Sequence, residues 1–227
     1  MKKFKSLVLT VIGLLCSVSV SAHDFEADGI YYNITSLTPM TVEVTYRGNK
    51  YNSYSEEYSG AVNIPESVTY NGKTYNVTSI GYSAFEGCSG LTSVKIPNSV
   101  TSIWSSAFDF CSGLTSVVIP NSVTIIGKAA FFGTAWYNNQ PDGLVYCGDF
   151  LLDYKGTMAD NTSISIKEGT ILIANGAFEH CSGLTSVVIP NSVTSIGSAF
   201  YGCSGLTSVV IPNSVTSIGR HAFVKCI

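Results

Sequence analysis

The sequence predicts a mainly β solenoid, in which turns of 22 to 23 residues stack through short strands and are closed by short 3₁₀ or helical turns. Two observations predict this fold. The segment CSGLTSVVIPNSVTSIG begins at Cys181 and again at Cys203. The period also continues through much of the chain, because five cysteines are separated by 23, 70, 22 and 23 residues: Cys88, Cys111, Cys181, Cys203 and Cys226. Self-similarity at a fixed period of roughly 20 to 50 residues is typical of stacked repeat architectures.

Each turn contains two short segments that favour β-structure. In residues 184–189 the spacing L-x-x-V-x-I places three apolar side chains on one side of a strand. Pro190 ends that strand, because it lacks the N–H that a further ladder hydrogen bond needs. Residues 193–196 form the second segment, and Gly197 turns the chain. We expect residues 199–203 to close the turn as a 3₁₀ or short helical segment.

Apolar residues recur at fixed offsets from the cysteines. Thr134 and Met158 stand where the 70-residue gap lacks a cysteine. An aromatic ring lies three positions before most of these cysteine positions: Phe85, Phe108, Phe131, Phe178, Phe200 and Phe223. An isoleucine lies eight positions after most of them: Ile96, Ile119, Ile166, Ile189 and Ile211. Because one turn cannot bury its own apolar side, we expect stacking to align these residues in columns at the inter-strand spacing of about 4.8 Å.

Two regions depart from the repeat. We expect residues 23–77 to form an N-terminal β cap that leads into the first repeat, because they alternate like an antiparallel pair and Asn71-Gly72 favours a hairpin turn. Residues 78–227 would then form the solenoid. Within it, residues 135–156 are an insertion, which we expect to bulge out as a loop or hairpin while the coil continues beneath it.

The start of the chain indicates export. Residues 1–22 have a basic beginning, a short apolar stretch and a small-x-small ending, which together predict a signal peptide. No second apolar run of spanning length follows, so no transmembrane segment is expected after cleavage. The mature protein is therefore expected to be secreted or held at the cell surface, with the periplasm as a further location.

The repeat motif itself has a known counterpart. The pattern L-x-x-V-x-I-P-N-S-V-T-x-I-G, with A-F-x-x-C, resembles the BspA-like leucine-rich repeats of exported and surface proteins in bacteria and some protists, and the resemblance covers residues 58–227. The segment A-W-Y-N-N-Q-P-D-G is similar to an insertion in relatives. Similar repeats are associated with attachment to host or neighbouring-cell surfaces. The resemblance thus implies a leucine-rich repeat coil that adheres to a protein or glycan ligand there.

The sequence argues against several kinds of chemistry. Charged residues make up 12% of the chain, the formal net charge is −3, and no Lys/Arg cluster follows residue 22, so nucleic acid is not an expected partner. His180 and His221 lie near no periodic partner that would complete a catalytic triad. No CxxC or Cys/His ligand spacing indicates a metal. We therefore predict no catalytic residue, no cofactor and no enzyme activity.

The cysteine column has two interpretations. Cysteines at the same height of successive turns pack as small apolar side chains, and a structural disulfide is the alternative in an exported chain. Cys226 lies at an open end of the predicted coil, which makes it a candidate for an intermolecular disulfide.

Two surfaces are candidates for ligand binding. The outward strand position between the apolar Val and Ile is occupied by Lys95, Val118, Val188 and Val210. An exposed apolar stripe of this kind often marks a contact surface, although the β-propensity of valine also accounts for it. The aromatic insertion with Trp136 and Tyr137 is either a recognition loop or a patch packed against the solenoid edge.

Two functions follow from these observations. The first is a non-enzymatic, exported protein that mediates protein–protein or cell-surface adhesion through the solenoid surface. The alternative is a structural scaffold or spacer that self-associates end to end or presents another module, since the last predicted turn has no polar capping unit.

Overall fold

The computed structural model describes residues 23–48, 50–52 and 57–226. The chain is mostly strand, as predicted, and the one helix among these residues is the four-residue α1, Ala135–Asn138. Residues 1–22, and with them the predicted signal peptide, lie outside the described residues. Within the described part, no helix is long and apolar enough to cross a membrane.

The N-terminal hairpins and the first repeats share one sheet. Its strands are β1 (Phe25–Ala27), β2 (Ile30–Leu37), β3 (Met40–Thr45), β5 (Ser67–Tyr70), β6 (Lys73–Ile80), β8 (Ser102–Ile103) and β9 (Ile125–Ile126). β2 and β3 pair antiparallel, which confirms the predicted pair. Asn71 and Gly72, between β5 and β6, have φ of 49° and 72°, which a type I′ turn requires. β6 pairs in parallel with both β3 and β8 and thereby joins the hairpins to the repeats.

The repeats contribute further short strands, each of which pairs in parallel with a strand of an adjacent turn. On one side of the turns these strands are β4 (Gly60–Asn63), β7 (Leu91–Lys95), β12 (Thr162–Ser165), β14 (Leu184–Val188) and β16 (Ser208–Val210). On the other side they are β13 (Leu172–Ile173), β15 (Ser195–Ile196) and β17 (Ser217–Ile218). Ile173 lies opposite Ile196, and Ile196 lies opposite Ile218. The register therefore advances by one sequence period per turn.

The periodic phenylalanines stack as predicted, but in two separate groups. The ring centroids of Phe85 and Phe108 are 4.9 Å apart, and those of Phe108 and Phe131 are 5.2 Å apart. A second group continues from Phe178, with 5.2 Å between its ring and that of Phe200. Interplanar angles of 5° to 6° within these pairs show that each ring repeats the placement of the one before it. The spacing is close to the inter-strand distance of about 4.8 Å, so the backbone ladder sets it.

The segments that close the turns are not 3₁₀ helices, contrary to the prediction. In residues 81–88 the amide of Cys88 donates to the carbonyl of Phe85 at 3.0 Å, which is an i→i−3 hydrogen bond. However, Ser83 and Gly87 have φ of 54° and 73°. A right-handed helix requires negative φ throughout, so these segments are successive tight turns that contain one or two left-handed residues each.

The insertion is a hairpin, but the prediction that it bulges out over a continuing coil is wrong. Its strands are β10 (Gly143–Cys147) and β11 (Phe150–Lys155). β11 also pairs in parallel with β13, with Leu151 opposite Ile173. Adjacent side chains of a strand point to opposite faces, and Phe150 lies in one core cluster while Leu151 lies in the other. The hairpin is therefore a layer inside the molecule, because both of its faces are apolar and both are covered.

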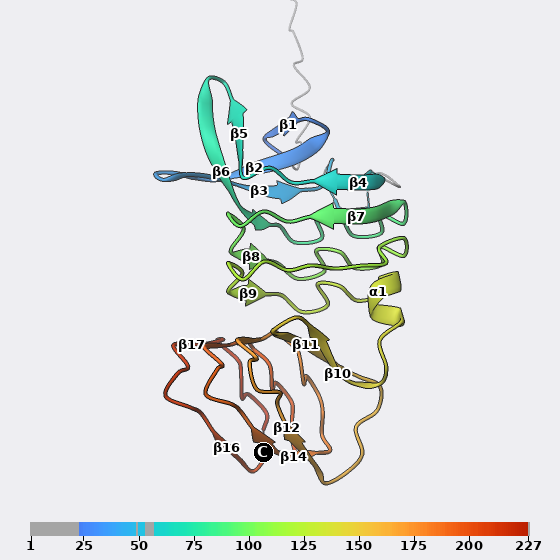
Figure 1. Cartoon of the computed structure of the whole chain (residues 1–227), viewed down its shortest axis with the longest axis vertical. Coiled ribbons are helices and arrows are strands. Elements are labelled where there is room, and N and C mark those ends of the chain that lie inside the picture. Colours follow the sequence, from blue (N-terminus) through green and yellow to red (C-terminus); the bar gives the residue numbers. More distant parts are fainter. Residues whose placement is uncertain (1–22, 49, 53–56, 227) are drawn as a thin grey trace, which may run out of the picture.

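This layer separates two sets of turns, which we call the first stack (residues 57–133) and the second stack (residues 162–226). Figure 1 shows that the turns of the first stack run across the view, whereas those of the second run steeply, with β11 at the corner. The amide of Ala174 donates to Leu151 and the next amide, of Asn175, donates to Ile126, both at 2.9 Å. Leu172, on the outer face of β13, is buried in the first core cluster. The outer face of the second stack thus covers the end of the first.

Candidate functional site

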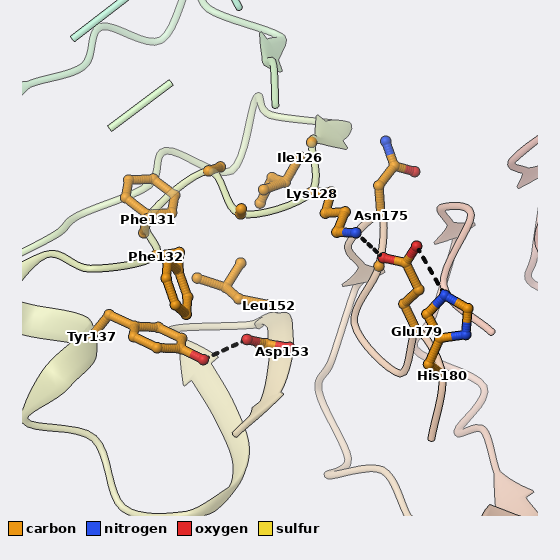
Figure 2. A pocket seen from close by; sticks show the side chains of 14 residues that line it. Ile126, Lys128, Phe131, Phe132, Tyr137, Leu152, Asp153, Asn175, Glu179 and His180 are labelled. Atoms are coloured by element: carbon orange, nitrogen blue, oxygen red, sulfur yellow. Dashed lines mark hydrogen bonds and ion pairs between the residues drawn. The ribbon is translucent and has the colours of Figure 1, made fainter. Parts of the chain in front are cut away.

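A cleft of 390 Å³ opens at the corner between the two stacks. One wall is formed by residues 126–132 of the first stack together with Tyr137. Leu152 and Asp153 of β11 also line it, and the opposite wall belongs to the second stack: Asn175, Gly176, Glu179 and His180. Figure 2 shows aromatic rings on one side and Lys128, Glu179 and His180 on the other. Ligand sites are commonly clefts of a few hundred cubic ångströms at the boundary between packed units.

The aromatic wall combines buried and accessible rings. Phe131 is buried in the first core cluster, whereas Phe132, the next residue, is 44% exposed. The rings of Phe132 and Tyr137 lie 5.4 Å apart between centroids. Tyr137 is placed by α1, because the hydroxyl of Thr134 caps this helix and accepts a hydrogen bond from the amide of Tyr137 at 3.0 Å. The wall is therefore held by the repeat itself, since Thr134 occupies a cysteine position and is fully buried.

A hydrogen bond joins this wall to the hairpin. The hydroxyl of Tyr137 donates to Oδ2 of Asp153 at 2.5 Å. Burial raises the pKa of Tyr137, and the hydrogen bond to Asp153 raises it further. Burial also raises the pKa of Asp153, while the hydrogen bond from Tyr137 opposes that shift. The ammonium group of Lys155 lies nearby and donates to the carbonyl oxygens of Asn138 and Gln140, at 2.9 and 2.6 Å. The carboxylate of Asp153 therefore already has a hydrogen-bond partner within the fold.

An ion pair links the two stacks on the other side of the cleft. Nζ of Lys128 lies 2.5 Å from Oε2 of Glu179. The imidazole Nε2 of His180 lies 3.9 Å from Oε1 of the same carboxylate. Asn175 accepts a hydrogen bond from the amide of Ser198 at 2.7 Å through its side-chain oxygen. The ammonium group of Lys128 therefore lies beside the amide, imidazole and carboxylate groups of the opposite wall (Figure 2).

Two side chains near the cleft adopt a conformation that glycine takes in other turns. Two residues after the stacked phenylalanine, Gly87, Gly133 and Gly202 have positive φ, and Phe110 and His180 occupy the same position with φ of 55° and 60°, as Lys225 does in the last turn with φ of 60°. A Cβ on Gly133 would lie 2.8 Å from the ring of Phe110, and one on Gly202 would lie 2.5 Å from the ring of His180. Each ring therefore lies over the glycine of the following turn.

The predicted stripe of outward residues is exposed but divided. Val188 and Val210 are 61% and 80% exposed and lie directly opposite each other in the β14–β16 pair. Val118 is 76% exposed, and Lys95, also exposed, lies opposite Asn63 in the β4–β7 pair. The β4–β7 and β12–β14–β16 sheets are separate, because the hairpin intervenes. The four residues are exposed, as expected, but they do not lie in one sheet, and their role in binding stays a prediction.

The aromatic insertion is packed rather than projecting. The amide of Trp136 donates to the carbonyl of Leu114 at 2.8 Å, and its ring meets Phe131 edge-on with 6.1 Å between centroids. Tyr137 is only 7% exposed. These contacts agree with the packing interpretation. Only Tyr137 of this pair also lines the cleft.

The cysteines are unpaired, buried or half-buried thiols. All six in the described residues are free: Cys88, Cys111, Cys147, Cys181, Cys203 and Cys226. The thiols of Cys111 and Cys203 each donate to a phenylalanine carbonyl of the preceding turn at 2.9 Å. Burial raises the pKa of Cys88 to about 11 and that of Cys203 to about 12. Half-buried Cys226 makes the same contact, to Phe200, at 3.0 Å, and its intermolecular disulfide stays a prediction. No group of side chains in the described residues could hold a metal ion.

Sequence reasoning missed most of the cleft. Asp153 had the appearance of ordinary surface charge, His180 that of a solvated turn residue, and Lys128 carried no signal at all. Alignment of the turns places Phe110, His180 and Lys225 in a column that is glycine in three other turns, so this column alone does not single out the cleft. The pairing of Lys128 with Glu179 depends on the corner and has no counterpart in the repeat.

Several solved structures are similar to this chain. A leucine-rich cell surface protein from Faecalibacterium prausnitzii A2-165 is 30% identical, with a TM-score of 0.44; the match covers 89% of this chain and 52% of that one, so this chain spans about half its length. A leucine-rich repeat protein from Bacteroides ovatus is 24% identical over 90% of this chain and 80% of that one, with a TM-score of 0.40. The Treponema pallidum leucine-rich repeat protein is 22% identical over 89% and 88%, with a TM-score of 0.39.

Comparison with family sequences is more decisive. No curated protein matches this chain. Residues 63–140 and 154–227 match the model of the BspA type leucine-rich repeat region, in 6 copies. The gap between the two matched segments contains the β10 strand and most of β11, which is where the structure departs from regular stacking. The chain belongs to the BspA-type leucine-rich repeat family.

Proposed function

We propose that this protein is an exported, non-enzymatic binding protein, whose stacked turns form a leucine-rich repeat solenoid that attaches to a protein or glycan on a host or neighbouring cell. The observation that carries this proposal is the pair of exposed valines, Val188 and Val210, which lie directly opposite each other on paired strands. Apolar groups held in fixed rows in water are typical of contact surfaces. A rigid stack supports such rows because each turn fixes the next.

Export is supported by two observations. Residues 1–22 have the composition of a signal peptide. Proteins with BspA-type repeats are typically exported or found at the cell surface, and the similar protein from Faecalibacterium prausnitzii is described as a cell surface protein. We infer that the mature chain acts outside the cytoplasm.

The state of the reactive side chains supports a binding role rather than catalysis. Of the two carboxylates that line the cleft, Asp153 accepts a hydrogen bond from Tyr137 and Glu179 pairs with Lys128. The thiol of Cys203 is buried, with its pKa raised to about 12, so it is held in the unreactive protonated form. These groups are arranged to stabilise the fold and to offer fixed contacts.

An adhesion assay tests the proposal. The mature protein, immobilised on beads, is expected to retain epithelial cells or matrix-coated surfaces, and the double variant Val188→Thr/Val210→Thr should reduce retention severalfold without lowering the thermal midpoint. Val224→Thr is the matched control, because Val224 is also exposed but lies on the turn side. Absence of retention by the native protein on every surface, or equal retention by the double variant, would contradict the proposal.

A further inference from the structure

We propose that the cleft at the corner between the two stacks binds the end of a neutral saccharide chain, with the ring of Phe132 as the stacking surface. This inference rests on the proposed binding function and names a ligand class for one site. It concerns the cleft lined by residues 126–132, Tyr137, Leu152, Asp153 and residues of the second stack, and does not involve the exposed valines.

A row of ring contacts leads into the cleft. Phe110 is 57% exposed, and its ring meets that of Phe132 edge-on at 5.8 Å. Phe132 in turn lies 5.4 Å from Tyr137 inside the cleft. An exposed ring binds the apolar C–H face of a pyranose, while the hydroxyls of the sugar stay free for hydrogen bonds. A cleft of 390 Å³ is large enough to enclose a sugar of one or two rings.

Hydrogen-bond donors and acceptors are mixed around the cleft. Lys128, Asn175 and His180 offer donors, and Glu179 and Asp153 offer acceptor oxygens. A sugar hydroxyl both donates and accepts, so it matches such a mixed set better than a ligand with donors or acceptors alone. Figure 2 shows that these groups come from both sides of the cleft, which would fix the orientation of a bound ring.

The charges of the cleft favour a neutral ligand. Lys128 and Glu179 form an ion pair, so their charges largely cancel. The remaining carboxylate, Asp153, accepts a hydrogen bond from Tyr137 and lies where burial raises its pKa. No cationic cluster is therefore left to bind a sulfated or phosphorylated group. An acidic ligand would have to break the ion pair first.

The strands around the cleft argue against an extended peptide as the ligand. Peptides are often bound as an added strand, which requires a free strand edge. At the cleft, β11 lies between β10 and β13, and the carbonyl of Ile126 in β9 accepts from Asn175. Recognition there depends on side chains, as it does for saccharides.

NMR titration of the full mature protein with cellobiose, lactose, chitobiose and mannobiose tests the proposal. At least one of these probes should shift amide resonances of residues 126–132 and 175–180 in a saturable manner. Phe132→Ala should then raise the Kd by about tenfold, which is the loss of one stacking contact. Lys128→Gln, a second variant at an exposed side chain, should also weaken binding. Tyr82→Ala is the control, because Tyr82 is exposed and stacks on Trp104 away from the cleft.

Three outcomes would overturn the inference. They are no shift at the cleft with any of the four disaccharides, equal affinity in Phe132→Ala, and binding of a heparin-derived disaccharide or a peptide in place of the neutral sugars. If the native protein adheres to cells but no disaccharide shifts the amide resonances of the cleft, only the saccharide inference is contradicted. If a sugar binds saturably at the cleft but the native protein does not adhere to any surface, the proposed attachment is contradicted and the saccharide site is still supported.

Discussion

The regular turns and the corner between the two stacks follow different rules. In the regular turns each ring rests on a copy of itself, as Phe85, Phe108 and Phe131 do at 4.9 and 5.2 Å. At the corner, Phe131 and Phe178 belong to different core clusters, and the contacts join unlike residues, such as Lys128 with Glu179. The repeated residues therefore build the scaffold. The cleft, with its contacts between unlike and charged side chains, lies at the corner, where the repeat is interrupted.

The inserted hairpin causes this difference. A strand with one apolar face would lie on the surface, but β11 has Phe150 on one face and Leu151 on the other, and both are buried. Its two faces complete two cores, so it ends one stack and begins another. The stacking direction changes at this hairpin (Figure 1). The cleft is lined by residues of both stacks at this corner.

The largest effect is expected in the ring column. Phe108→Ala removes a fully buried ring that stacks on two others, so the free energy of unfolding should fall by about 3–5 kcal/mol. The matched change at the corner, Phe132→Ala, removes a half-exposed ring and should cost much less. Urea unfolding of both variants measures the contrast. Equal losses would mean that the column does not carry the stability of the stack.

The next effect concerns glycines at close approaches between turns. A Cβ on Gly127 would lie 2.2 Å from the amide nitrogen of Ser105, so Gly127→Ala should destabilise the protein by about 1–3 kcal/mol or more. Gly148, in the hairpin turn, has open space around it but φ of 59°, so Gly148→Ala should cost only about 1–2 kcal/mol. Thermal unfolding compares the two. If Gly127→Ala lowers the stability less than Gly148→Ala does, the turns at Gly127 and Ser105 lie farther apart than the structure has them.

A third effect depends on pH. Burial, and secondarily Glu86, raises the pKa of Asp109 to about 6, and Oδ1 of Asp109 is buried without a hydrogen-bond partner. A raised folded-state pKa gives stability that is present below the unfolded value of about 4 and is lost as the pH rises through about 6. Asp109→Asn should therefore be more stable than the native protein at pH 7 to 8, and the advantage should vanish near pH 4. Urea midpoints across this range test it; a constant difference would contradict the shift.

The smallest effect on stability is expected at Cys226. Serine can keep the hydrogen bond to the carbonyl of Phe200, so Cys226→Ser should change the free energy of unfolding by less than about 0.5 kcal/mol. In the native protein a thiol reagent should label Cys226 and Cys181 first, because Cys203 and the other described cysteines are buried. Light scattering with and without reductant then tests the predicted intermolecular disulfide. Fast labelling of Cys203 would contradict the packed column.

The regular turns could be predicted from the sequence because each residue has copies of itself as neighbours. The spacing of Phe178, Phe200 and Phe223 alone places their rings in one column. The left-handed residues of the turns were missed, since a helical turn and a series of tight turns share the same i→i−3 hydrogen bonds.

The corner could not be predicted in the same way. Lys128 and Glu179 are 51 positions apart, and nothing in the repeat brings them together. Residues 150–152 are three consecutive apolar residues, so both faces of a strand there would be apolar, but whether both faces are covered depends on the direction of the second stack. That direction is set by Asn175 and Ala174, which bond to two different layers.

Hydrogen exchange by NMR tests most directly whether the hairpin is a layer inside the molecule. The amides of Tyr154, Ala174 and Asn175 donate to Ala177, Leu151 and Ile126 across the corner. They should be protected to a degree similar to the amide of Phe108 within the first stack. Exchange of these three amides at the rate of an unstructured peptide, with Phe108 still protected, would show that the hairpin hangs outside a continuous coil.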